Sequence, residues 1–286
     1  MASLRLVTGG EADLRQVEGG GTDSTYFPGY GGISISARRV SVERTPGSEA
    51  SIALRRALCL VLTACREEAL GEAMEPLGYP ISKASWACPE EAEGGALTME
   101  DALEQAEALL ETSGRPEAPL LGCAAADSPM VGILEAAAEA LETLDVELDV
   151  TRCDTPEEVW EMAAAGEADL WALTWQTGAE PDMMSLYHSR GSANHTGIAD
   201  KNLDSILSEA RGVRDPEIRK GLYKNALDKI AAWAVEVPVY QRRVRWEYSE
   251  DVDPETLPPE ATAFYGWWCE AEKLGARDGS GILQDS

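Results

Sequence analysis

Imidazoles are scarce in this chain, which contains two histidines, His188 and His195. Ser185 and Ser189 lie close to His188, so a serine–histidine–acid arrangement is conceivable. No Gly-x-Ser-x-Gly turn is present, however, to expose a serine nucleophile. The two histidines and Asp182 lack the ligand spacing of a zinc site. The sequence therefore predicts no catalytic residue, no metal ligand, no cofactor and no enzymatic activity.

Acidic side chains dominate the charge of the protein. The 51 Asp and Glu outnumber the 24 Lys and Arg, which gives a formal net charge of -27. A surface of that sign repels phosphate backbones, so we expect no nucleic-acid partner. Carboxylates are too frequent for one pair to be singled out for acid–base catalysis, and most are expected on solvated helix faces.

The cysteines and the apolar runs limit the cellular setting. The six cysteines form no Cys-x-x-Cys pair, and buried free thiols are expected rather than disulfides or metal ligands. No apolar run approaches the roughly 20 residues that cross a bilayer. The N-terminus has no apolar segment of a secretory signal, so the chain as it stands is expected in the cytoplasm.

The ends of two predicted strands carry the side chains best suited to hold a ligand. One end leads into a helix at Ser128, and the other carries Trp175, Gln176, Thr177 and Gly178. Ligands of open parallel sheets bind beyond the carboxyl ends of the strands. A helix N-terminus there can donate N–H groups to a carboxylate, and a tryptophan offers an aromatic platform. The alternative for Trp175 is an ordinary core position.

The succession of strand and helix patterns between residues 118 and 175 predicts an α/β fold. Strand patterns occupy 118–125, 145–151 and 169–175, and the intervening helices begin at Ser128-Pro129 and at the capping box Thr155-Pro-Glu-Glu. Such a succession gives parallel strands joined by right-handed crossovers. We expect strand 118–125 to lie between the other two.

The remaining elements follow from capping and turn signals. The glycines of residues 1–32 precede an alternating strand pattern, so they indicate turns between short strands rather than a phosphate-binding loop. Asp200 and Asp215 are expected to cap two helices. Helices are predicted at about 48–73, 98–114, 182–188, 201–212 and 216–233, an irregular segment at 76–97, and paired extended segments at 236–248.

An ordered series of motifs resembles the family 5 extracellular solute-binding proteins, the peptide- and nickel-binding group. Between residues 166 and 250 the motifs are Gly166-Glu-Ala-Asp-Leu-Trp-Ala-Leu-Thr-Trp, Pro181-Asp-Met-Met-Ser-Leu-Tyr-His-Ser, Asn202-Leu-Asp-Ser-Ile-Leu-Ser-Glu-Ala-Arg, Asp215-Pro-Glu-Ile-Arg-Lys-Gly-Leu-Tyr and Val235-Glu-Val-Pro-Val-Tyr-Gln-Arg. Upstream, Leu54-Arg-Arg-Ala-Leu, Tyr79-Pro-Ile-Ser and Ser85-Trp86 extend the resemblance to about residues 24–275.

The resemblance implies a periplasmic-binding-protein-like type II lobe, with a parallel-rich sheet flanked by helices, hinge strands and part of a first lobe. Residues 1–44 would be Gly-rich crossover strands from the first lobe, 45–235 the second, ligand-binding lobe, and 236–286 the hinge return with the C-terminal part of the first lobe. Members of the family are longer, so a fragment lacking the N-terminal half of the first lobe is expected. Apolar side chains near the two ends, such as Tyr265, Trp267 and Trp268, would then be exposed.

The resemblance also implies a function. The chain would be the solute-binding component of an ABC importer, holding a peptide or another small polar solute between two lobes and delivering it to permease subunits. It would act at the cell surface or in the periplasm, attached to the membrane only through a lipid anchor that this chain does not contain. A solitary lobe that serves as a non-transport interaction or sensor module is the alternative.

The resemblance adds two residues to the predicted site and questions a third. Tyr30 and Tyr240, on the hinge strands, are expected near the ligand. Oligopeptide binders of the family usually carry an Asp where this chain has Gly178, and that Asp pairs with the amino group of the peptide. Glu180 or Asp182 could take its place, so the identity of the solute stays open.

Overall fold

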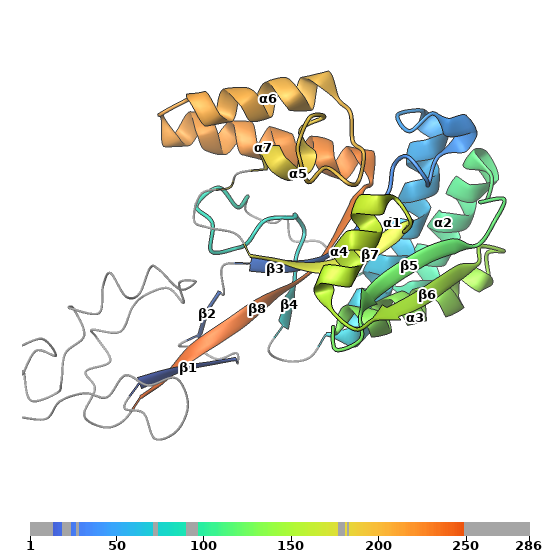
Figure 1. Ribbon diagram of the computed structural model, residues 1–286, viewed down its shortest axis with the longest axis horizontal. Coiled ribbons are helices and arrows are strands. Elements are labelled where there is room, and N and C mark those ends of the chain that lie inside the picture. Colours follow the sequence, from blue (N-terminus) through green and yellow to red (C-terminus); the bar gives the residue numbers. More distant parts are fainter. Residues whose placement is uncertain are drawn as a thin grey trace, which may run out of the picture.

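A mixed sheet runs through the computed structural model, which describes residues 14–18, 24–26, 29–70, 74–89, 97–176, 181 and 183–248 (Figure 1). Six of its strands follow the order β1-β8-β3-β7-β5-β6, and β2 and β4 also pair with β8. The strands are β1 (Leu14–Glu18), β2 (Ser24–Tyr26), β3 (Gly29–Ile35), β4 (Met74–Pro76), β5 (Leu120–Ala125), β6 (Leu148–Cys153), β7 (Leu170–Gln176) and β8 (Glu236–Tyr248).

Helices surround one half of this sheet (Figure 1). They are α1 (Glu49–Ala69), α2 (Met99–Ser113), α3 (Met130–Glu142), α4 (Pro156–Ala165), α5 (Met184–Tyr187), α6 (Lys201–Gly212) and α7 (Pro216–Trp233), with a short 3-10 turn at Val42–Arg44. Among the described residues, no helix is both long and apolar enough to span a membrane.

The three strands predicted to be parallel are parallel neighbours. β5 pairs with β6 on one side and with β7 on the other, so β5 is central as predicted. The rest of the sheet differs from the parallel-rich expectation, because the pairings of β3 and β8 are antiparallel.

The expected pair of segments at 236–248 is a single strand, β8. Pro238 does not interrupt it, since the register with β3 shifts opposite this proline, between Gly31 and Gly32. Proline is tolerated in a sheet where the ladder is already irregular.

Side-chain caps define most helix starts as predicted. Ser48, Thr98 and Thr155 each accept the N–H of the residue three positions on, and both predicted Asp caps accept two N–H groups. α3 is the exception, because it begins at Met130 and Pro129 occupies the cap position rather than the first helical position. Proline has no side-chain acceptor, and the Oγ of Ser128 accepts the Met130 N–H at 3.3 Å instead.

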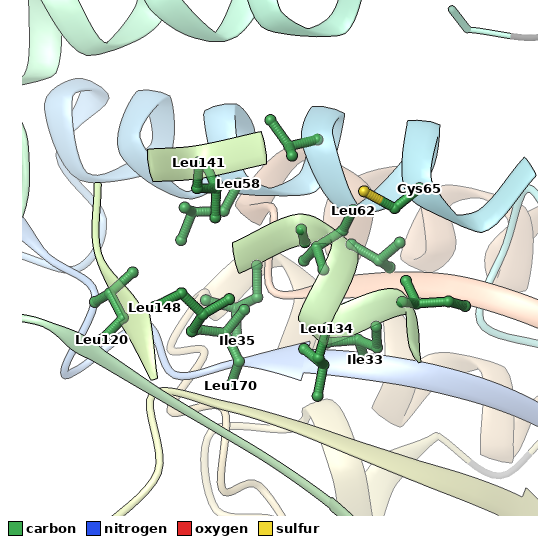
Figure 2. Packing of buried hydrophobic residues seen from close by; sticks show 14 of the residues in the cluster. Ile33, Ile35, Leu58, Leu62, Cys65, Leu120, Leu134, Leu141, Leu148 and Leu170 are labelled. Atoms are coloured by element: carbon green, nitrogen blue, oxygen red, sulfur yellow. The ribbon is translucent and has the colours of Figure 1, made fainter. Parts of the chain in front are cut away.

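Alternate residues of each strand point to opposite faces of the sheet. On the first face, Ile33 and Ile35 of β3 and Leu170 of β7 pack beneath α1, α2 and α3. Figure 2 shows Leu58 and Leu62 of α1 pointing toward these strands. This face forms the larger apolar core.

The second face is covered by other helices. Cys123 and Leu173 pack against Val159 of α4. A further core cluster joins α5, α6 and α7 to the irregular segment around Ile81. The described cysteines are free thiols as predicted, three of them buried and two half-buried, whereas Cys269 lies outside the described residues.

A buried arginine links the beginning of α1 to the end of α7. Arg55 is fully buried, and its guanidinium donates to the carbonyl oxygens of Val40 (3.0 Å), Pro46 (2.9 Å) and Trp233 (3.0 Å from both Nε and Nη2). Burial lowers its pKa to about 10. The side chain is therefore charged at neutral pH, and carbonyl dipoles stabilise the charge.

Candidate functional site

A row of three residues crosses the second face of the sheet where β7, β3 and β8 lie side by side. Ser34 of β3 is opposite Trp171 of β7 and opposite Glu236 of β8. All three are buried. Because directly opposed residues on antiparallel strands share a face, their side chains form the floor of one site.

Glu236 places a carboxyl group on that floor. Its Oε2 accepts a hydrogen bond of 2.6 Å from the Oγ of Ser34, whereas Oε1 is buried and has no hydrogen-bond partner among the described residues. A methyl group on Gly32 would collide with Oε1, so a glycine at this position makes room for the carboxyl group. Burial raises the pKa of Glu236 to about 8, against the opposing effect of the Ser34 hydroxyl, so the group is mostly protonated at neutral pH.

Two tyrosine hydroxyls flank this carboxyl group. Tyr30 of β3 and Tyr187 of α5 are buried and hydrogen-bonded to each other through their side chains. Burial, followed by the proximity of Glu236, raises the pKa of both tyrosines well above the usual value. Both tyrosines are therefore neutral at pH 7, and their hydroxyls lie beside the Glu236 carboxyl group.

Aromatic rings form the wall opposite the floor. The ring of Trp160 on α4 meets Trp175 of β7 edge-to-face at 5.9 Å between centroids, and it meets His195 in the same way at 4.4 Å. Burial, followed by the charge of Arg38, lowers the pKa of His195, so its imidazole is neutral at pH 7. Trp175 Nε1 and His195 Nε2 are both buried, and no residue in the described part of the chain hydrogen-bonds to either.

These groups enclose a small cavity of about 10 Å³. A cavity of this size holds about one water molecule. Its lining residues are Ser34, Trp160, Trp171, Trp175, Leu186, Tyr187, Ala193, His195, Thr196 and Glu236. The cavity therefore combines an apolar, aromatic wall with a few polar atoms, which is the usual composition of a ligand site.

Asn194 holds the segment that closes the cavity from the far side. Its Nδ2 donates to the carbonyl oxygens of His188 (3.0 Å) and Ile198 (2.9 Å). Its Oδ1 accepts from the Thr196 hydroxyl (3.1 Å) and the Gly197 N–H (3.0 Å). These four hydrogen bonds fix the loop that carries His195.

The structure brings only some of the predicted ligand-site residues together. Trp175 and Tyr30 are opposite each other on the second face, Trp175 half-buried and Tyr30 buried. Gln176 is exposed at the end of β7. Tyr240 is buried and reaches across Gly31, where its hydroxyl lies 3.0 Å from the Oγ1 of Thr174. Because Thr174 and Trp175 are consecutive in a strand, Tyr240 lies on the opposite face from Trp175.

Other predicted site residues lie elsewhere or outside the described part of the chain. Ser128 follows β5, where its N–H donates to the Ala125 carbonyl at 2.9 Å and its side chain is half-buried. Predicted residues that fall outside the described ranges are Thr177, Gly178, Glu180, Asp182, Tyr265, Trp267 and Trp268.

The conceivable serine–histidine pair is part of a hydrogen-bonded turn. The hydroxyl of Ser189 donates to Asp204 at 2.5 Å, and its N–H donates to the same carboxylate at 2.7 Å. The Nδ1 of His188 accepts the Arg190 N–H at 3.0 Å and lies 3.7 Å from the Asp204 carboxylate. Ser189 thus bonds the Asp204 carboxylate and not the His188 imidazole. In a catalytic triad the serine bonds the histidine, and the histidine bonds the acid.

Sequence reasoning missed the buried carboxyl group of the site. Glu236 is one of many carboxylates, and its only local signal was its position at the start of an apolar strand, Glu236-Val-Pro-Val. His195 was considered only as a catalytic or zinc-binding residue. Within the described ranges, no group of three His, Cys, Asp or Glu side chains is arranged to hold a metal ion.

The sequence matches no family model and no curated protein. The fold, however, is similar to an ABC transporter substrate-binding protein from Listeria monocytogenes, CtaP (16% identity, TM-score 0.65, 86% of this chain and 49% of that one). It is also similar to the oligopeptide-binding protein AppA from Bacillus subtilis in complex with a nonapeptide (15%, 0.64, 88% and 51%) and to NikZ from Campylobacter jejuni in complex with Ni(L-His) (16%, 0.62, 84% and 49%).

These similarities confirm the predicted periplasmic-binding-protein-like fold. The neighbours are peptide and nickel substrate-binding proteins, the group whose motifs the sequence resembles. The chain spans about half the length of these neighbours, which agrees with the expected relation to a longer, two-lobed architecture.

Proposed function

We propose that the chain provides the second lobe and the hinge strands of a solute-binding protein that serves an ABC importer. The observation that carries the proposal is the fold shared with peptide-binding proteins over more than four-fifths of this chain. Its solute would be a peptide or another small polar molecule, its partners permease subunits, and its location the cell surface or the periplasm.

The arrangement of the sheet supports a division of the chain into a hinge and two lobes. β3 leads into the helical part of the chain, and β8 leads out of it. The two strands pair with each other, with Ser34 opposite Glu236. Two antiparallel strands at the entry and exit of a lobe are suited to act as a hinge, because hinge closure concentrates its backbone changes in a few connecting residues. We therefore assign residues 1–44 and 236–286 to the hinge and first lobe, and 45–235 to the second lobe.

The solute would meet this lobe at the end of β7. Trp175 is half-buried and Gln176 is exposed there, so an aromatic ring and an amide are both accessible at this strand end, on opposite faces of the sheet. Thr177 and Gly178 follow Gln176 in the sequence and stay part of the proposed site, while the N-terminus of α3 behind Ser128 offers backbone donors. Tyr30, opposite Trp175, would support the tryptophan ring from within rather than contact the solute.

Isothermal titration of the full chain with a nonapeptide, tri-alanine and the nickel–histidine complex tests this function. Trp175→Ala should weaken binding of the accepted probe by about 1–3 kcal/mol, the worth of a lost aromatic contact. Trp86→Ala is the matched control, because Trp86 packs against Tyr223 of α7 and should leave the affinity unchanged.

Two outcomes would contradict the proposal. Absence of binding for all three probes would favour the solitary interaction or sensor module over a transport protein. The second outcome is that Trp175→Ala unfolds the protein while the remaining folded molecules bind with normal affinity. Trp175 would then be a core residue, and the solute site would have to lie elsewhere.

A further inference from the structure

The cavity behind Trp175 presents three polar atoms that no described residue satisfies. They are Trp175 Nε1, His195 Nε2 and Glu236 Oε1, and all three are buried. They belong to three separate elements: strand β7, the loop that Asn194 fixes, and the first residue of β8. All three residues line the same cavity of about 10 Å³. Buried polar atoms without a partner are rare, so their gathering around one cavity calls for an occupant.

The chemistry of the three atoms restricts what the occupant can be. The indole nitrogen only donates, so the occupant must accept a hydrogen bond, which excludes an ammonium ion. An anion would lose its hydration shell in this buried cavity, which disfavours a charged occupant. The neutral imidazole can donate or accept, and so can the protonated Glu236 carboxyl group. An uncharged group that accepts from the indole and can donate or accept toward the other two atoms fits all three.

The volume of the cavity limits the size of the occupant. About 10 Å³ admits one non-hydrogen atom, and buried water molecules typically make about three hydrogen bonds to polar groups of this kind. We propose that the cavity formed by Trp175, His195 and Glu236 is a binding site for one neutral, hydroxyl-sized group, supplied by a solvent water molecule or by the hydroxyl of a small solute. This site does not depend on the transport function proposed above.

A crystal structure of the full chain at a resolution that shows ordered water tests the site directly. We expect one density peak within hydrogen-bond distance of Trp175 Nε1, His195 Nε2 and Glu236 Oε1. A second crystal soaked in methanol separates the two sources, since a solute hydroxyl would replace the peak while its methyl group, which the cavity volume does not admit, would extend the density beyond the cavity. An unchanged peak would identify the site as specific for water.

Two results would overturn the proposal. One is an empty cavity in both crystals. The other is a protein side chain or backbone group that satisfies the three atoms directly.

A double-mutant cycle in solution tests the same bridge without a crystal. Trp175→Phe removes the N–H and keeps a ring, and Glu236→Met removes both carboxyl oxygens and keeps a side chain of similar length. No direct hydrogen bond joins the two side chains, so any coupling between their effects on the melting temperature must pass through the cavity that they share. With a bridging group, the double variant should melt measurably higher than the sum of the two single shifts predicts.

Glu107→Met on α2, combined with Trp175→Phe, is the matched control. Glu107 pairs with Arg115 and is remote from the cavity, so this second cycle should be additive. Additive shifts in both cycles would mean that nothing connects Trp175 with Glu236, and would contradict the shared site.

Discussion

The two faces of the central sheet are built from alternate residues of the same strands, yet they bury different chemistry. On β3, Ile33 and Ile35 enter the large apolar core, while Ser34 between them binds the Glu236 carboxyl group. On β7, Leu170 and Ala172 face the same core, whereas Trp171 and Trp175 line the cavity. The core face thus buries side chains that need no hydrogen-bond partner, whereas the cavity face buries polar groups that do need one.

The difference indicates where this sheet is optimised for stability and where it is not. Apolar burial stabilises a fold without geometric demands on polar atoms, whereas an unsatisfied buried polar atom costs about 1–3 kcal/mol. Groups of that kind persist at sites where they serve a ligand or a motion. The cavity face is therefore the place to test function, and the core face is the place to test folding.

The largest expected effect is a pH dependence that belongs to the cavity face. The pKa of Glu236 is raised to about 8 in the folded protein, from an ordinary value near 4.5. The folded state therefore holds this proton more tightly than the unfolded chain. Its contribution to the free energy of unfolding is fully present below pH 4.5 and is lost between pH 4.5 and 8, by roughly 5 kcal/mol.

Glu236→Gln isolates this effect. Urea denaturation at several pH values from 5 to 9 should show a smaller loss of stability for the variant than for the parent over that window. Tyr30 and Tyr187 stay neutral throughout, and His195 titrates identically in both proteins to a first approximation. Parallel stability curves for parent and variant would show that Glu236 is ionised in the fold.

The next effect belongs to the core face and should be nearly as large. Leu58 of α1 is fully buried in the apolar core, and Leu58→Ala should lower the free energy of unfolding by about 3 kcal/mol. Leu173→Ala makes the same change on the cavity face, where the side chain is 8% exposed. Urea denaturation should give the smaller loss for Leu173→Ala. Equal losses would erase the distinction between the two faces.

The smallest effect is expected away from both faces. Ile218 on α7 is 55% exposed, so Ile218→Ala should change stability by no more than about 0.5 kcal/mol. Ile230→Ala is the matched comparison on the same helix, because Ile230 is fully buried and its truncation should cost about 2–4 kcal/mol. Thermal denaturation of both variants measures the contrast. A large loss for Ile218→Ala would reveal a packing partner for its side chain.

Local signals in the sequence were enough for much of the helical architecture. α6 and α7 span the predicted residues, because Asp200 and Asp215 cap them and Pro216 sets the first turn of α7. The parallel unit β7-β5-β6 was predictable for the same reason, since each strand and helix in it has a clear local pattern. Capping and periodicity act within a few residues and can be read directly from the chain.

The cavity was not predictable in this way. Glu236 meets Ser34 from 202 positions away, and the pairing depends on β3 lying between β7 and β8. No local pattern encodes that order, and proline at position 238 argued against one continuous strand. Trp175 was identified from its place at a strand end, but its neighbours Trp160 and His195 come from elements whose approach is set by tertiary packing.

The guanidinium of Arg55 has a consequence for the connectivity of the chain. It binds the carbonyl oxygens of Val40 and Pro46 at one end of a long segment and that of Trp233 at the other. The segment 40–233 is thus closed into a loop by a single side chain, and its two ends lie within one arginine's reach. Such proximity is the geometric requirement for circular permutation, so a short linker joining these ends could let the segment fold from a new starting point inside it.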